Sequence, residues 1–385
     1  MDRTIGMITG VLLVFFVWFG LVRASHQELW NDESYSLVSS IMGRSYGRML
    51  VGDMGGVEGN NTPLFYVLQK LQCDVFSYHM PQAWVDGKWD REDIFSQVFL
   101  RVQPVLFIAL SLSALFYYFA VRYSLTVGFY SVMVALSSFM LWAHWTEARP
   151  YALLFFLTTA QILLLLELLR GTPSGHKVWG WLALVHCLLA LTTSVSALQI
   201  VACSVVLWSF SCRQWQRYLA MTVLPVSICL FYYFTFPNVS NFIFHFVDGP
   251  VALISANIPK DRFFIIFIFA LFFWGRRWQA KDRNPIALEG KYIVFLGLML
   301  LAYAAVLVRF KAMEPANGYQ GFQVPARYFM SLTPAGIVAT TLFSVWLVRA
   351  SDPKFVRPAV VLGLIVFLTF RLHRTSEVFH WGLPL

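Results

Sequence analysis

The chain has 385 residues, of which 58% are hydrophobic, 17% aromatic and only 13% charged. Soluble proteins carry about 25% charged residues, so this composition excludes a soluble multidomain enzyme and is typical of a polytopic membrane protein. The net charge of +9 could indicate a nucleic-acid partner. However, the sequence has no Lys/Arg-rich run of about five to eight residues. Its basic residues instead separate apolar segments, as they do in membrane proteins, so no nucleic-acid partner is expected.

The first apolar segment runs from Ile5 to Val22 and has about the length of one transmembrane helix. A cleaved signal peptide is the alternative, but no clear small-residue cleavage site follows, so we expect a retained first helix. Together with the later apolar runs, it predicts an all-α integral membrane protein with about eleven transmembrane helices. The predicted spans are 5–22, 98–120, 125–142, 151–169, 178–193, 196–211, 218–236, 262–274, 291–308, 328–348 and 357–370.

The distribution of charge predicts a cytoplasmic N-terminus. In this orientation the cytoplasmic connections hold 14 of the 29 basic and five of the 20 acidic residues, a net charge of +9. The other side holds 15 of each and is neutral, which agrees with the positive-inside rule. One long extracytoplasmic loop, 23–97, and two shorter ones, 237–261 and 309–327, remain. We expect one transmembrane domain over 1–385, without a separate C-terminal soluble domain.

The first extracytoplasmic loop begins with LWNDESYSLVSS, residues 29–40, which contains the adjacent carboxylates Asp32 and Glu33. Tyr35, Val38 and Met42 follow at helical spacing, and this pattern predicts a short amphipathic juxtamembrane helix on the membrane surface. Asp32 would lie in its first turn, where the helix dipole favours a carboxylate. The alternative is that Asp32 only caps this helix.

Three further stretches place polar residues at predicted span ends on the same side. NNTPLFYVLQKLQ, 60–72, is typical of a turn followed by a re-entrant or interfacial helix. HWTEARPYALLFFL, 144–157, contains Glu147 and Arg149 before a helix that Pro150 begins. These two charges form either a structural pair or a functional group that faces a cavity. QVPARYFMSLTPAG, 323–336, contains Arg327, which is either a snorkelling anchor or a phosphate ligand.

The order of these motifs resembles the C superfamily of integral-membrane glycosyltransferases. The closest likeness is to bacterial relatives of the protein O-mannosyltransferases and of the lipid A aminoarabinose transferase. It extends from residue 1 to about 340 and is best in the first 160 residues and in 326–334. The segment Thr146–Leu153 matches the family closely, and Arg101–Pro104 matches the start of its second span. Asn61–Tyr66 and Thr192–Ser196 match family segments that normally contain a histidine, which is absent here.

This resemblance implies an enzyme that moves a sugar from a polyprenyl-phosphate donor to a hydroxyl of a glycan, lipid or protein acceptor. A single displacement would invert the anomeric centre. Asp32 would be the catalytic base, and Glu33 or Glu147 would position the acceptor or Arg149. Arg149 and Arg327 would bind the donor phosphate, with Arg101, Lys260 and Arg262 as weaker candidates. The expected cavity residues are Tyr35, Asn61, Tyr66, Tyr151 and Tyr328.

The implied location is a bacterial inner membrane, with the active site on its periplasmic side. Two carboxylates could bind a divalent cation near the phosphate, but their spacing does not require one. The five cysteines show neither CxxC pairs nor metal-ligand spacing, so neither a disulfide framework nor a structural zinc site is predicted. The alternative function is a flippase or transporter of lipid-linked sugars. It predicts ionisable groups in the middle of spans, and His186 is the main residue of this kind.

Overall fold

The computed structural model describes residues 2–54, 61–80, 93–171, 175–211, 215–235, 288–312, 330–351 and 356–379. Every regular element within these ranges is a helix, and one isolated antiparallel bridge joins Asn61 to Thr193. The predicted all-α class is confirmed. The helices are α1 (Asp2–Ser25), α2 (Asn31–Tyr35), the π-helix η1 (Ser36–Met42), α3 (Tyr46–Leu50), α4 (Leu64–Val75), α6 (Ile94–Arg122), α7 (Leu125–Leu136), α8 (Phe139–His144), α9 (Tyr151–Arg170), α10 (Gly175–Ala190), α11 (Ser196–Phe210), α12 (Trp215–Tyr218), the π-helix η2 (Leu219–Val223), α13 (Leu224–Thr235), α16 (Leu288–Ala312), α17 (Leu332–Ala350) and α18 (Val356–Phe379).

Ten of the eleven predicted spans fall on apolar helices of the described residues, and one of these ten, 125–142, is divided between two helices. Within the described residues, seven helices are long and apolar enough to cross a membrane, and three apolar helices are shorter, namely α7, α10 and α11. The predicted span 262–274 lies outside the described residues. The number of spans and the cytoplasmic N-terminus therefore stay predictions.

The prediction of one continuous span over 125–142 is wrong. The chain forms α7, breaks at Ser137 and Ser138, and continues as the six-residue helix α8. Ser138 caps α8, because its hydroxyl oxygen accepts a hydrogen bond from the backbone N–H of Leu141 at 3.1 Å. The twelve residues of α7 rise only about 18 Å, too little to cross a hydrocarbon core of about 30 Å. Hydropathy alone does not reveal this break, since both sides of it are apolar.

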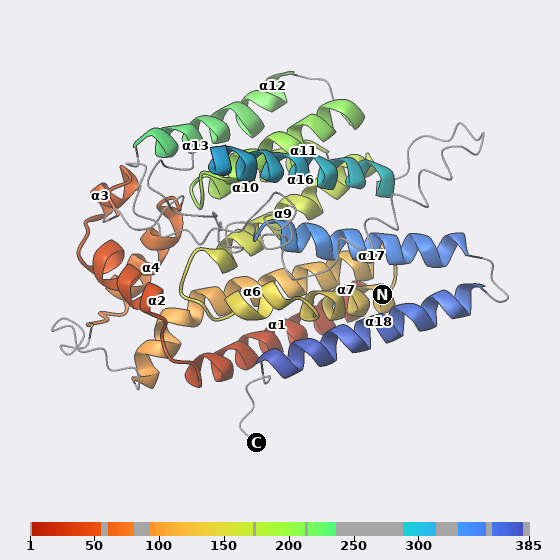
Figure 1. The fold of residues 1–385 in the computed structure, drawn as a ribbon, viewed down its shortest axis with the longest axis horizontal. Helices are drawn as coiled ribbons and strands as arrows, with labels where there is room; N and C mark the ends of the chain where they lie inside the picture. The colour runs from red at the N-terminus through yellow and green to blue at the C-terminus, as the bar shows by residue number, and fades with distance from the viewer. Residues whose placement is uncertain are drawn as a thin grey trace.

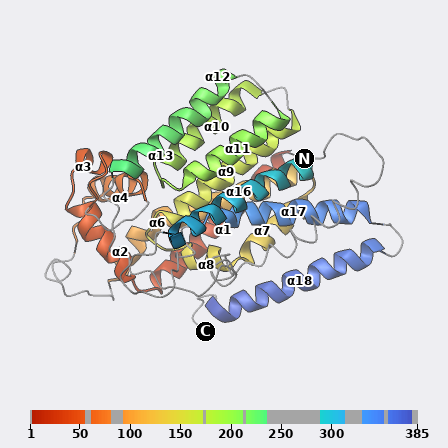
Figure 2. The ribbon, with the colours of Figure 1, turned by 45° about the horizontal axis from the view of Figure 1, so that its top comes forward.

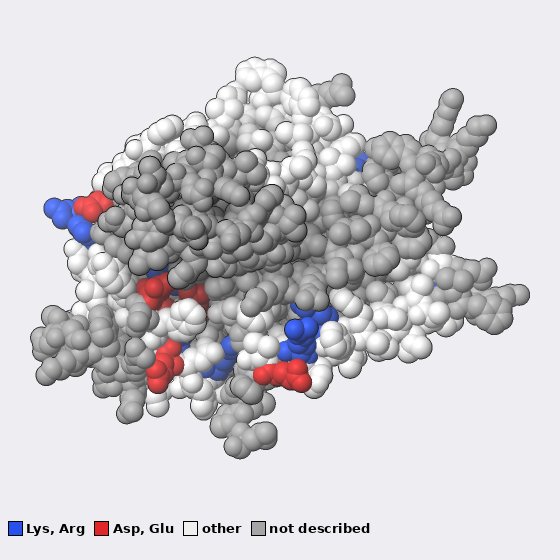
Figure 3. Space-filling view, viewed as in Figure 1, with Lys and Arg blue, Asp and Glu red and all other residues white. Residues whose placement is uncertain are grey.

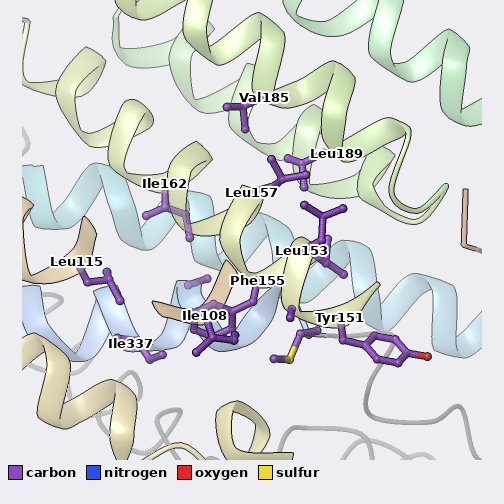
Figure 4. Close-up of a cluster of buried hydrophobic side chains, with 14 of the residues drawn as sticks. Ile108, Leu115, Tyr151, Leu153, Phe155, Leu157, Ile162, Val185, Leu189 and Ile337 are labelled. Carbon is purple, nitrogen blue, oxygen red and sulfur yellow. The ribbon is translucent and has the colours of Figure 1, made fainter. Parts of the chain in front are cut away.

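The helices pack as a bundle around α9 (Figure 1). α9 contacts α6, α10, α11, α16 and α17, and 72% of its most apolar 18-residue segment is buried in the protein. Figure 4 shows how leucine and isoleucine side chains from α6, α9, α10 and α17 meet in this core. An amphipathic helix would leave one face to water or lipid, whereas α9 buries most of its side chains and lies in the interior.

One end of the bundle carries α2, α3 and α4, and we call it the site end (Figures 1 and 2). The connection between α10 and α11 lies at the same end, because the backbone N–H of Thr62 donates to the carbonyl of Thr192 at 3.0 Å. α3 is tied to α4 by Tyr46, whose hydroxyl donates to Asp74 Oδ2 at 2.6 Å. This hydrogen bond raises the pKa of Tyr46 to about 12.

Figure 3 shows few charged atoms on one face of the described residues. Most of them lie over the site end and over the last turns of α18. A surface in contact with lipid has to be largely uncharged, because a charged side chain in the hydrocarbon region is costly. The distribution agrees with an integral membrane protein whose polar groups gather at helix ends.

Close packing of α1 generates the first prediction. A Cβ atom at Gly20 would lie 2.6 Å from Val105 Cγ1 of α6 and 2.8 Å from Trp145 Nε1. Gly20→Ala should therefore force α1 away from both neighbours and destabilise the protein by about 1–3 kcal/mol. Gly10→Ala in the same helix is the matched control, because a Cβ atom there would meet none of the described residues within 4 Å. Thermal unfolding in detergent compares the two, and equal melting temperatures would contradict the close contact.

Candidate functional site

Residues 31–42 form a helix, as the sequence predicts, but its first turn is not capped by Asp32. The N-cap is Trp30, whose backbone is extended (φ −71°, ψ 152°). Glu33 Oε2 accepts a hydrogen bond from the backbone N–H of Trp30 at 2.7 Å, so Glu33 closes the turn from within. Asp32 is half-buried in the same turn. The alternative that Asp32 serves only as the cap is wrong, since the cap position belongs to another residue.

Arg101 of α6 is bonded through its whole guanidinium group. Its Nε donates to Glu33 Oε1 at 3.1 Å and its Nη2 to Glu33 Oε2 at 2.7 Å, so the guanidinium grips the carboxylate with two parallel bonds. Its remaining three N–H groups donate to backbone carbonyls, those of Ala24 (3.3 Å), Gln27 and Glu28 (2.8 Å). A guanidinium has five N–H groups, and here each of them has an acceptor.

This saturation does not fit the expected phosphate-binding role of Arg101. A phosphate would have to displace Glu33 or a backbone carbonyl from a side chain that is only 2% exposed. The ionic partner of Arg101 is already present in the protein. Its geometry instead fits a positioning residue that fixes the loop between α1 and α2.

Glu33 is saturated in the same way. Besides Arg101, it accepts hydrogen bonds from the backbone N–H groups of Trp30 and Ala148, the latter at 2.5 Å on Oε1. A carboxylate offers about four lone-pair positions, and four donors point at Glu33. It therefore both pairs with an arginine and closes the helix turn. Such bonding favours a structural role for Glu33 over the role of base.

The loop between α8 and α9 lies against α2. Arg149, which is buried, donates from Nη1 to the backbone carbonyl of Asp32 at 3.2 Å and to Ser36 Oγ at 2.6 Å. Thr146 bonds to the side chain of Gln27 in the loop that follows α1. The structure thus places Arg149, from one sequence motif, directly beside Asp32, from another that lies 117 residues away.

His144 belongs to the site, although the sequence motifs alone do not single it out. It ends α8, and its Nδ1 contacts Glu147 Oε2, so Glu147 pairs with this histidine. The His144 ring lies 5.0 Å from the ring of Tyr151, centroid to centroid. The sequence signal for this pair is a histidine three residues before a glutamate at a helix end. Glu147 and Arg149, the pair that the sequence suggests, are joined through the backbone, where the Arg149 N–H donates to the Glu147 carbonyl at 2.7 Å.

The segments around Asn61 and Thr193 pair with each other. Asn61 forms the isolated bridge with Thr193, and the backbone N–H of Leu64 donates to the carbonyl of Leu191 at 2.7 Å. The Asn61 amide also donates to the hydroxyl of Tyr66 at 3.3 Å, and both side chains are buried. The expected cavity residues Asn61 and Tyr66 therefore lie together, in contact with the α10–α11 connection.

Not every expected site residue joins this group. Tyr35 is 48% exposed whereas its neighbour Ser36 is buried, so the two do not share one environment. Arg327 and Tyr328 lie outside the described residues, as do Lys260 and Arg262. Within the part of the chain that the structure describes, no three His, Cys, Asp or Glu side chains gather as metal ligands would. No residues are therefore assigned to a divalent cation.

The buried pair generates the second prediction. Glu33→Gln keeps the shape of the side chain but leaves the Arg101 cation buried without its counter-charge. Removing one partner of a buried ion pair costs about 3–5 kcal/mol, so the yield of folded protein and its melting temperature should both fall. Glu28→Gln is the control, because it makes the same chemical change at an exposed residue of the same loop. Size-exclusion chromatography and thermal unfolding measure both variants, and a wild-type melting temperature for Glu33→Gln would show that the pair is dispensable.

The comparisons with known proteins agree with this architecture. No protein-family model and no curated protein matches the sequence. Among solved structures, the chain is similar to ArnT from Cupriavidus metallidurans in its crystal structure bound to undecaprenyl phosphate. The TM-score is 0.53 at 13% sequence identity, over 98% of this chain and 75% of ArnT. The chain thus has an ArnT-like polytopic membrane fold, which confirms the all-α membrane architecture predicted from the sequence.

Proposed function

We propose that this protein is a membrane glycosyltransferase that transfers a sugar from a polyprenyl-phosphate donor to an acceptor hydroxyl on the extracytoplasmic face. The observation that carries the proposal is the contact of Arg149 with the Asp32 carbonyl and Ser36. It brings a cation suited to phosphate and a carboxylate suited to proton removal to one place at the site end.

The proposed reaction is a single displacement. The acceptor hydroxyl oxygen forms a bond to the anomeric carbon while the bond from that carbon to the phosphate oxygen breaks. The hydroxyl proton passes to the Asp32 carboxylate, and polyprenyl phosphate leaves with the bonding electron pair. Attack from the face opposite the leaving group inverts the anomeric centre. Arg149 stabilises the charge that develops on the departing phosphate.

The neighbouring residues have supporting roles in this scheme. Glu33 is occupied by Arg101 and two backbone N–H groups, so it fixes α2 and leaves Asp32 as the base. Glu147 and His144 form a second acid–base pair beside Tyr151, at the end of α8 and in the loop that leads to Arg149. Arg327 remains the proposed second phosphate ligand, on the basis of its sequence motif.

The structural likeness to ArnT supports the donor class. That protein was crystallised with undecaprenyl phosphate, the kind of lipid that a polyprenyl-phosphate sugar releases on transfer. A glycan, a lipid or a protein hydroxyl can serve as acceptor in this scheme. The proposed location is a bacterial inner membrane, with the site end on the periplasmic side as the charge distribution predicts.

The flippase alternative depends chiefly on His186. This histidine is fully buried, its Nδ1 lies 2.6 Å from the carbonyl of Met221, and its Nε2 lies 2.9 Å from Gln161 Nε2. Both ring nitrogens are therefore engaged, with Nδ1 as the donor and Nε2 as the acceptor. A histidine held in this way joins helices and does not line a transport pathway for a lipid-linked sugar. This arrangement favours the enzyme.

The proposed function is tested by the turnover of Asp32→Asn. Purified protein is given a polyprenyl-phosphate sugar and an acceptor extract, and the release of polyprenyl phosphate is measured. Asparagine keeps the shape but cannot take the proton, so turnover should fall about 10²–10⁴-fold while the melting temperature is unchanged. Asp53→Asn is the control, since Asp53 is an exposed carboxylate paired with Arg44 at the same end. Near-normal turnover of Asp32→Asn would remove Asp32 as the base, and no release by the wild type would favour the flippase.

Arg149 provides a separate prediction about donor binding. Arg149→Ala should weaken binding of undecaprenyl phosphate more than Arg149→Lys does, because lysine keeps a point charge whereas alanine keeps neither charge nor fork. We expect about 10- to 100-fold weaker binding for the alanine variant, the loss of one or two charge-assisted hydrogen bonds. Thermal shift with added lipid measures the affinity. If both variants bind like the wild type, Arg149 has only the structural role of holding α2.

A further inference from the structure

The break between α7 and α8 exposes backbone groups in the interior of the protein. Ser137 and Ser138 separate the two helices, and both are buried. The chain has risen only about 18 Å along α7 when it reaches the break, which is less than the thickness of a hydrocarbon core of about 30 Å. Carbonyl groups freed at such a depth need donors from the protein, because no bulk water reaches them.

The last helix, α18, supplies these donors. Arg371 Nη2 donates to the carbonyl of Ser137 at 3.0 Å. The hydroxyl of Thr375 can donate to either of two carbonyls. Its Oγ1 lies 3.3 Å from the Ser137 carbonyl oxygen and 2.8 Å from that of Arg371 in its own helix. The two residues are four apart and therefore lie on one face of α18. Figure 2 shows the last turns of α18 beside α8. One carbonyl at the break thus meets two donors from a helix more than 230 residues away in sequence.

α18 is otherwise weakly attached to the bundle. Only 6% of its most apolar segment is buried in the protein, against 72% for α9 and α17. It lies at the edge of the bundle in both views (Figures 1 and 2). Arg371 begins the polar last turns of this helix, and its partly buried side chain reaches the break from there.

The break leads directly into the candidate site. α8 has six residues and ends at His144, three residues before Glu147 and five before Arg149. Its other end is held from α1, since Arg23 Nη2 donates to the carbonyl of Trp142 at 3.1 Å. Four of its six side chains are buried, so packing holds the body of α8, and the hydrogen bonds at its two ends fix the backbone that leads into the loop.

We propose that Arg371 and Thr375 are positioning residues for the site loop, residues 145–150. They fix the start of α8, and α8 in turn fixes His144, Glu147 and Arg149 relative to Asp32. The proposal rests on the proposed function for its activity readout. It assigns to α18 a role in placing the catalytic groups, although α18 itself contributes none of them.

The experiment compares two arginines on the same helix. Arg371→Ala removes the donor to Ser137, whereas Arg374→Ala removes an equal charge from an exposed position less than one turn away. Turnover of Arg371→Ala should fall about 10- to 100-fold, because a displacement of about 1 Å at a reacting group costs on the order of 100-fold. Arg374→Ala should stay within about twofold of the wild type. Arg371→Lys keeps a charged donor, so its turnover should lie between those of the wild type and Arg371→Ala.

Thr375 gives an independent check with a conservative rescue. Thr375→Val removes the hydroxyl but keeps the shape, and turnover should fall roughly two- to tenfold, as for one neutral hydrogen bond. Thr375→Ser keeps the donor and should restore turnover. If valine and serine variants behave alike, packing and not the hydrogen bond matters, and the proposal is wrong for this residue.

Hydrogen exchange separates this proposal from the proposed function. Backbone amides of residues 139–150 should exchange faster in Arg371→Ala than in Arg374→Ala, by about tenfold, while α9 stays protected. Faster exchange in a protein whose wild type shows no transfer would uphold the positioning role and reject the enzyme. An active wild type whose Arg371→Ala variant keeps both normal exchange and normal turnover would overturn the positioning role alone.

Discussion

The buried ion pair between Glu33 and Arg101 is the interaction on which the site depends. Two opposite charges lie almost entirely out of water, and burying each ion costs several kcal/mol before any compensation. The compensation is geometric, since every donor of the arginine and every acceptor position of the carboxylate is used. The pair joins α6, the loop after α1, the first turn of α2 and the loop before α9. Four segments from separate parts of the sequence are thereby held in one arrangement.

This pair also gives the two adjacent carboxylates, Asp32 and Glu33, different roles. Glu33 is buried, and all of its acceptor positions are used in structural hydrogen bonds. Asp32, one residue earlier, is half-buried. Neighbouring residues on a helix face different directions, so a single short turn can hold both a structural and a reactive carboxylate. Arg149 contacts the backbone carbonyl of Asp32 and the hydroxyl of Ser36, so it holds this turn from the other side.

Composition and hydropathy predict most of the fold, because a membrane imposes apolar helices of nearly fixed length. The same signal could not show the break at Ser137, since its carbonyl is satisfied by Arg371 and Thr375 from the far end of the chain.

At the site, the motifs predict that Asp32 and Arg149 lie together, and the bond between them agrees. The roles of Arg101 and Glu147 are harder to predict, because a charge's partner depends on three-dimensional packing: Arg101 takes Glu33, and Glu147 takes His144. Arg327 and Tyr328 lie outside the described residues, so the phosphate-binding role of Arg327 and the place of Tyr328 in the cavity stay predictions.

The pairing of residues 61–64 with 190–193 runs largely through the main chain. Thr62 and Leu64 donate their backbone N–H groups to backbone carbonyls, and the Thr62 hydroxyl donates to a third carbonyl, that of Ala190. Three of the five hydrogen bonds of Arg101 end on carbonyls as well. Contacts of this kind accept almost any side chain at the acceptor position. A fold assembled in this way can keep its shape while its sequence drifts beyond recognition, so distant relatives will be found by comparing backbones and then asking whether a buried Glu–Arg pair is present.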